Sequence, residues 1–151
     1  MLTPPPGPEE LPPLVEVGED ERELIRLGLP QAAHELLAMV TYLTAGDGPL
    51  EAVAATGRLG DLHPRVLARM RERVDVIANF LRARISFFVT ARREDVDAFD
   101  AELELAGANL VASRSLAVVI DRLISGALPD EAEFDRLGDA ALGIYSAVEA
   151  L

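Results

Sequence analysis

Cysteine and lysine are both absent from this chain of 151 residues. Without cysteine, the chain has no disulfide framework, no thiol nucleophile and no cysteine-based zinc or iron–sulfur site. All 14 basic residues are arginines, and alanine and leucine are abundant, which is typical of a G+C-rich genome. No apolar run approaches the roughly 20 residues that cross a bilayer. The first residues are prolines and glutamates, where a signal peptide has basic and then apolar residues. We therefore expect a cytoplasmic protein without a membrane partner.

The charge is acidic and unevenly distributed. The chain contains 26 acidic residues, its formal net charge is −12, and half of its residues are apolar. That apolar content is enough to form the core of one globular domain. Residues 62–93 contain eight arginines and two acids, a local charge of +6, so the rest of the chain carries −18. Because such acidity repels phosphate groups, we expect no nucleic-acid partner.

Proline and glycine divide the chain into segments. Six of the ten prolines lie in the first thirteen residues, which predicts an extended arm over residues 1–17 and a single helical domain over 18–151. The other four prolines each open an apolar segment, and glycines follow most of these segments. The segments predict long helices at 30–45, 64–92, 94–125 and 129–150 and short helices at 19–28 and 50–56. No segment alternates with period two, so the fold class is all-α, a bundle of four long antiparallel helices.

The apolar faces of these helices predict what each one buries. In segment 64–92 one arc contains Val66, Leu67, Met70, Val74, Ile77, Leu81, Ile85 and Phe88. In the last segment one arc contains Phe134, Leu137, Ala141, Ile144, Tyr145 and Val148. Segment 94–125 has two arcs that do not join, which indicates either a kink near Gly107 or burial on two sides. If both arcs are buried, a second chain could cover one of them, and we therefore expect a homodimer.

Arginines are the candidate ligand-binding residues. Arg65, Arg69 and Arg73 recur every four residues and form a basic ridge on the predicted helix 64–92. The ridge would bind an anionic partner, unless these arginines pair with the acids that begin the next helix. Arg84 lies at the edge of the apolar arc, with Phe80 and Phe87 on the adjoining face. A guanidinium that is buried away from water must be paired, either with an internal acid or with a bound anion.

His34 is the candidate phosphate acceptor. The core arc of segment 30–45 leaves His34 on the opposite, exposed side, next to the small side chains of Ala38 and Thr41. The string from Ala33 to Ala38, AHELLA, resembles the phospho-accepting helix of histidine phosphotransfer domains. In that family an exposed imidazole accepts phosphate from a receiver domain, and the resemblance implies this role for His34. Leu37 stands where those domains usually have lysine, and Ala38 where they usually have glycine.

The sequence favours an interaction protein over an enzyme. It contains no Gly-x-Ser-x-Gly elbow, phosphate-binding loop or dinucleotide fingerprint, and its serines have no histidine within predictable reach. We expect no cofactor and no metal, because Gln31 replaces the carboxylate in a Glu-x-x-His motif that would include His34. We predict a module that binds another protein, as an adaptor, regulator or assembly factor. The alternatives are a phosphorelay module acting through His34 and an anion-binding or enzymatic bundle acting through Arg84 and nearby arginines.

Overall fold

A computed structural model of the chain describes residues 28–91 and 99–150. Within these ranges the structure consists of α-helices and their connections, without a strand. The helices are α2 (Leu29–Thr44), α3 (Pro49–Thr56), α4 (His63–Ala91), α5 (Asp100–Ile124) and α6 (Glu131–Glu149). They confirm the predicted all-α bundle. The predicted arm 1–17 and, except for Gly28, the predicted helix 19–28 lie outside the described residues.

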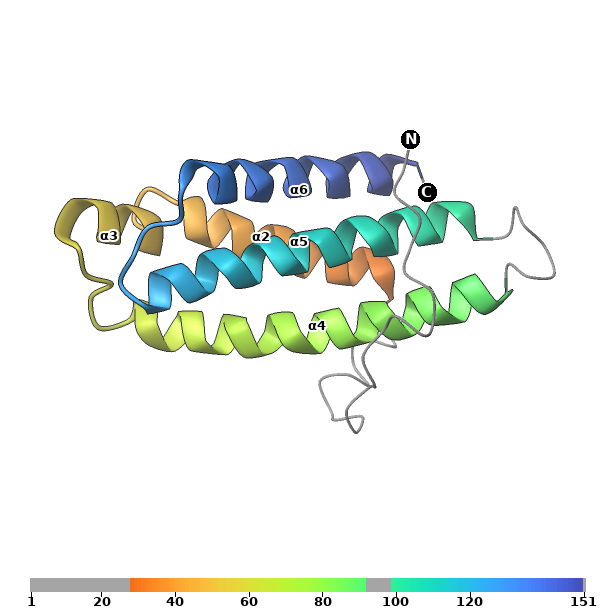
Figure 1. Cartoon of the computed structure of the whole chain (residues 1–151), viewed down its shortest axis with the longest axis horizontal. Helices are drawn as coiled ribbons and strands as arrows, with labels where there is room; N and C mark the ends of the chain where they lie inside the picture. Colours follow the sequence, from red (N-terminus) through yellow and green to blue (C-terminus); the bar gives the residue numbers. More distant parts are fainter. Residues whose placement is uncertain (1–27, 92–98, 151) are drawn as a thin grey trace.

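The helices form three layers (Figure 1). α4 is one outer layer, α2 and α5 form the middle layer, and α6 is the other outer layer. α5 packs against α4, α6 and α2, and α3 packs against α2 and α5 at one end of the bundle. Consecutive long helices run antiparallel, so α4 and α5 form one hairpin and α5 and α6 form another.

Prolines mark the helix starts, as the sequence predicts. Pro49 is the first residue of α3, and Pro30 and Pro64 are the second residues of α2 and α4. Pro129 lies two residues before α6. Proline is tolerated at these positions because the first N–H groups of a helix have no intrahelical partner.

The central helix α5 is buried on more than one side. It is continuous through Gly107, and its buried residues support the second of the two predicted alternatives, burial on two sides. Leu103 and Leu110 lie on one side of the helix and are buried, and Leu116 and Leu123 lie on another side and are buried as well. Because α4, α6 and α2 of the same chain cover this helix, its burial gives no reason to invoke a second chain.

By length and composition α5 could also cross a membrane. It has 25 residues, and 56% of its most apolar 18-residue window is buried inside the bundle. A helix surrounded by other helices is apolar for that reason alone. The composition of α5 is therefore that of a core helix.

The predicted buried face agrees with the structure for α4 and agrees only in part for α6. The face of α4 is confirmed: six of its eight residues, Leu67, Val74, Ile77, Leu81, Ile85 and Phe88, are buried, and Val66 and Met70 are half-buried. The face of α6 is wrong in part. Its buried line consists of Glu133, Leu137, Ala140, Ile144 and Ala147. Phe134 remains 47% exposed, Tyr145 57% and Val148 40%. The small alanines let α6 lie close to its neighbours, and the aromatic residues stay at the side.

Candidate protein-binding site

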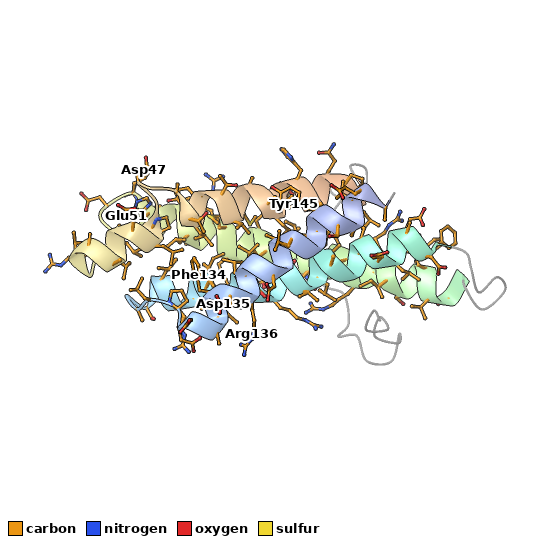
Figure 2. All side chains as sticks on the ribbon, turned by 90° about the horizontal axis from the view of Figure 1, so that it is seen from above. Asp47, Glu51, Phe134, Asp135, Arg136 and Tyr145 are labelled. Carbon is orange, nitrogen blue, oxygen red and sulfur yellow. The ribbon has the colours of Figure 1, made fainter. Side chains whose placement is uncertain are left out.

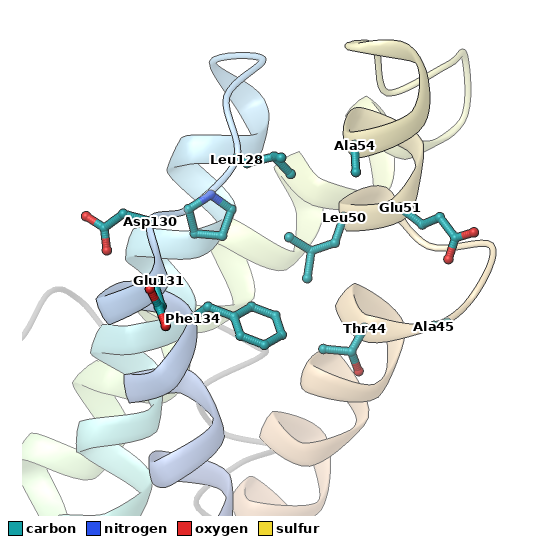
Figure 3. Close-up of a pocket in the computed structure, with 10 residues that line it drawn as sticks. Thr44, Ala45, Leu50, Glu51, Ala54, Leu128, Asp130, Glu131 and Phe134 are labelled. Atoms are coloured by element: carbon teal, nitrogen blue, oxygen red, sulfur yellow. The ribbon is translucent and has the colours of Figure 1, made fainter.

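A pocket with a volume of about 600 Å³ opens at the end of the bundle where α2 stops, α3 packs and α6 begins (Figure 3). We call it the end pocket. Leu50 and Ala54 of α3 line one side, Leu128 and Phe134 line the other, and Thr44 closes the side towards α2. These side chains come from three helices and one connection, so the end pocket exists only in the folded chain.

A tight turn between α2 and α3 positions one wall of the end pocket. The Gly48 N–H donates to the carbonyl oxygen of Ala45 at 2.9 Å. A Cβ atom on Gly48 would overlap the Tyr42 carbonyl oxygen, so the turn requires glycine. α3 ends at Gly57, which has a left-handed φ of 73° and donates its N–H to the Val53 carbonyl oxygen.

Tyr42 joins this turn to the start of α4. Its hydroxyl group hydrogen-bonds to Nδ1 of His63, the first residue of α4. The two rings also meet edge to face, with their centroids 5.7 Å apart. Burial raises the pKa of Tyr42 above its ordinary value, and the negative charge of Asp47 raises it further.

A capping box positions the opposite wall. The Asp130 side chain accepts a hydrogen bond from the Glu133 N–H at 2.7 Å, and the Glu133 side chain accepts one from the Asp130 N–H at 3.0 Å. Glu133 also pairs with the Arg122 Nε atom at 3.1 Å, which connects the end of α5 to the start of α6. Leu128 and Phe134 flank this cap, so the cap determines where they stand.

The interior of the end pocket is apolar and its rim is acidic. Figure 3 shows Leu50 and Phe134 pointing into the pocket, and the carboxylates of Glu51 and Asp130 pointing away from it at opposite edges. Glu131 also lines the pocket. Asp47 and Asp135 lie near Glu51 and Phe134 in Figure 2. Acids in the first turns of α3 and α6 stabilise the starts of their own helices.

An apolar stripe extends from the end pocket along α6. It consists of the exposed Phe134, Tyr145 and Val148 and the half-buried Ala141, and we call it the α6 flank. The spacings of seven, four and three residues place all four side chains on one side of the helix. Phe134 belongs to both features, because it lines the end pocket together with Thr44 of α2. Figure 2 shows Tyr145 further along α6, on the side towards α2.

The predicted basic ridge is divided in the structure. Arg73 is partly buried and forms a bidentate pair with Glu35 of α2, with an Nη2–Oε1 distance of 2.9 Å. Arg65 and Arg69 are exposed on α4. A ridge for an external anion therefore rests on Arg65 and Arg69, while Arg73 holds α4 against α2.

Arg71 pairs with Asp121, which lies near the end of α5 and not among the acids that were expected to pair with the arginines. Arg71 pairs with Asp75 at 2.6 Å and with Asp121 near the end of α5 at 3.0 Å. Burial lowers the pKa of Arg71, but the hydrogen bonds and charges of Asp75 and Asp121 outweigh burial and raise it above its ordinary value. Of the acids expected to pair with these arginines, Glu94, Asp95 and Asp97 fall outside the described residues, whereas Asp100, Glu102 and Glu104 lie in the first turns of α5.

Arg84 contacts aromatic rings, but Phe80 and Phe87 have different environments. Phe80 is a buried core residue, 3% exposed, and Phe87 is 56% exposed. The guanidinium carbon of Arg84 lies 5.2 Å from the ring centroid of Phe88 and 5.8 Å from that of Phe87, which are cation–π distances. The Arg84 Nε atom is buried, with no hydrogen-bond partner among the described residues. An anionic ligand for Arg84 remains a prediction.

His34 is exposed, as predicted, and Ala38 and Thr41 beside it are also exposed. The neighbouring Glu35 points the other way, because it pairs with Arg73. The geometry leaves the imidazole accessible, and its role as a phosphate acceptor remains a prediction. Within residues 28–91 and 99–150, no three histidine or carboxylate side chains gather closely enough to hold a metal ion.

Comparisons of the chain with protein-family models, with curated proteins and with solved structures found no match.

The end pocket does not follow from the sequence pattern. That pattern places Phe134 in the core and singles out neither Leu50 nor Leu128. One available signal was the width of the apolar arc of segment 129–150. That arc is wider than the buried line of α6, and the excess residues are the ones left at the surface.

Proposed function

We propose that this protein is an interaction module that binds another protein through the end pocket and the α6 flank. Such a module would act as an adaptor, regulator or assembly factor. The observation that carries the proposal is an apolar pocket continuous with exposed aromatic side chains, on a bundle that has a buried core of its own.

The size of this surface supports the proposal. Leu128 is 47% exposed, as is Phe134, and Tyr145 and Val148 extend the same surface. The exposed parts of these side chains amount to on the order of 300 Å², the size of patch that is often functional on a monomer. Aromatic residues beside a pocket are also the side chains most enriched among binding hot spots.

The wider partner predictions also stand as proposals. We propose that the protein acts in the cytoplasm, which the burial of α5 supports because that burial accounts for its apolar composition. The homodimer that we propose is one in which a second copy covers the α6 flank, since α5 is covered within one chain.

Site-specific photo-crosslinking tests the proposed function. A benzophenone amino acid replaces Phe134 in the full chain, which is expressed in the organism of origin and irradiated. We expect a discrete adduct with another protein. The matched control replaces Val111, which is 53% exposed on α5, away from the end pocket and the α6 flank.

The mass of the adduct separates the outcomes. An adduct from Phe134 and none from Val111 supports a protein-binding site. An adduct of twice the chain mass assigns the surface to a homodimer. The proposal fails if Phe134 gives no adduct, or if both positions give the same set.

A further inference from the structure

The charge around the end pocket narrows the chemistry of its partner. Together, α2, α3, the connection 125–130 and α6, with the 45–48 turn, contain nine acidic residues and one arginine, Arg136. Five of these acids line the end pocket or lie beside it: Asp47, Glu51, Asp130, Glu131 and Asp135. Two of these acids, Glu35 and Glu133, are already paired with arginines. The acids at the rim, including Glu51, Glu131 and Asp135, are exposed, and no ion pair is described for them. The rim therefore presents uncompensated negative charge.

The shape of the surface indicates a helical ligand. The α6 flank extends from Phe134 to Val148, fourteen residue steps or roughly 21 Å of helix axis. Leu37 and Val40 of α2 occupy the same side of that helix as Thr44, which lines the end pocket, and both are partly buried. The apolar path thus lies between two helices, where the side of a third helix can pack.

From these observations we propose that the end pocket and the α6 flank bind a basic amphipathic α-helix of a partner protein. Its apolar residues, spaced three, four and seven apart, would contact Phe134, Tyr145 and Leu128, and its arginines or lysines would face the acidic rim. This inference rests on the proposed function and adds the chemistry of the partner.

The negative charge of the rim disfavours other ligands of the end pocket and the α6 flank. A second copy that presented the same surface would place one acidic rim against another. Residues 1–17 contain three glutamates and no basic residue, so the proline-rich segment of this chain would also be repelled. Nucleic acids and anionic lipid surfaces carry the same unfavourable sign.

Three synthetic helical peptides test the inference against the full-length protein. The first has leucines at the stated spacing and lysines elsewhere, the second replaces the lysines with glutamates, and the third replaces the leucines with glutamines. We expect the first peptide to bind, measured by fluorescence anisotropy and calorimetry at low salt. The other two should bind at least about tenfold more weakly, the factor that corresponds to 1.4 kcal/mol.

Variants of the protein locate the binding site. Phe134→Ala should weaken binding of the first peptide about tenfold, and Ala54→Arg should block the end pocket with a bulky cation. The double variant Glu51→Gln/Glu131→Gln should weaken binding about threefold and flatten its salt dependence. The controls are Val111→Ala for the loss of exposed apolar surface and Asp61→Asn/Glu72→Gln for the loss of two exposed charges elsewhere. Thermal unfolding confirms that each variant folds.

The outcomes distinguish this inference from the proposed function. The basic-helix inference is overturned if a panel of such basic peptides fails to bind, if the acidic peptide binds equally well, or if Phe134→Ala and Ala54→Arg bind like the controls. If Phe134 still forms a crosslink to another protein, the proposed function stands and only the partner chemistry is wrong. If there is neither peptide binding nor a crosslink, both are wrong. Self-association through Phe134, detected by sedimentation, would assign the surface to a second copy.

Discussion

Tyr42 and His63 show how two side chains hold the end of the bundle together. Their hydrogen bond joins the last turn of α2 to the first residue of α4, across the segment that contains α3. Because Tyr42 is partly buried and Asp47 is near, the folded state favours the neutral phenol. The pair therefore links the stability of this end to pH.

We predict that Tyr42 destabilises the fold at alkaline pH. Its pKa in the folded chain is above the ordinary value of about 10, so above pH 10 the folded state retains a proton that the unfolded state has lost. The free energy of unfolding should then fall as pH rises from about 10. Urea unfolding between pH 8 and 11 measures this slope.

Tyr42→Phe tests the assignment of that slope. The variant should lose about 1 kcal/mol of stability at pH 8, because the hydrogen bond to His63 is lost. Its stability should depend less on pH above 10 than that of the original protein. Tyr145→Phe, at an exposed position, is the control and should retain the original slope. An unchanged slope in Tyr42→Phe would contradict the prediction.

The sequence predicted the exposure of a single residue correctly where that exposure depends only on the residue's position on its own helix. His34 is exposed because it lies opposite the core arc of α2. Arg73 could not be assigned in the same way, because its partner Glu35 is 38 residues away and comes close only when α2 packs on α4. The sequence indicated that internal acids could neutralise the arginines, but it could not indicate which acids.

At the scale of elements, the start of α6 combines a sequence signal with a tertiary contact. Pro129 predicts a helix start here, and the structure shows a capping box at Asp130. The pairing of Glu133 with Arg122 is tertiary, since it depends on the packing of α5 against α6.

We predict that the capping box sets the stability of α6. Asp130→Ala should lower the free energy of unfolding by about 1 kcal/mol, because the Glu133 N–H loses its acceptor. Glu133→Ala should cost more, because it removes both the reciprocal cap and the pair with Arg122. Asp135→Ala, at an exposed position on the same helix, should change stability by less than about 0.5 kcal/mol. Chemical denaturation measures all three, and equal losses would argue against the cap.

The face of α6 shows where prediction by pattern fails. Its apolar residues cover a wide arc, and periodicity alone placed Phe134, Tyr145 and Val148 in the core. The structure instead buries a line that includes Ala140 and Ala147. Small side chains permit a close approach between helices, so the choice of buried face depends on the neighbours as well as on hydrophobicity.

For the whole molecule, α5 is the helix on which the other helices pack. It contacts α2, α3, α4 and α6, and its residues are buried on several sides. Much of the hydrophobic stabilisation should therefore depend on this helix.

One leucine truncation and one valine truncation on α5 test whether the other helices depend on it. Leu116→Ala should lower the free energy of unfolding by about 2–5 kcal/mol, because Leu116 is fully buried and its truncation leaves a cavity. Val118→Ala should change stability by less than about 0.5 kcal/mol, because Val118 is 43% exposed on the same helix. Thermal and denaturant unfolding compare the two variants. Similar effects at both positions would contradict the central role of α5.

By itself, the sequence determined the helical class, the approximate helix boundaries and the core face of α4, because these depend on proline and glycine positions and on local periodicity. Only the tertiary structure decided which side of α6 is buried, which acids pair with Arg71 and Arg73, and where a pocket opens. Those features join residues that are distant in the chain, such as Leu50 and Phe134, and their contacts depend on how helices pack. The surface on which the functional proposal rests belongs to this second group.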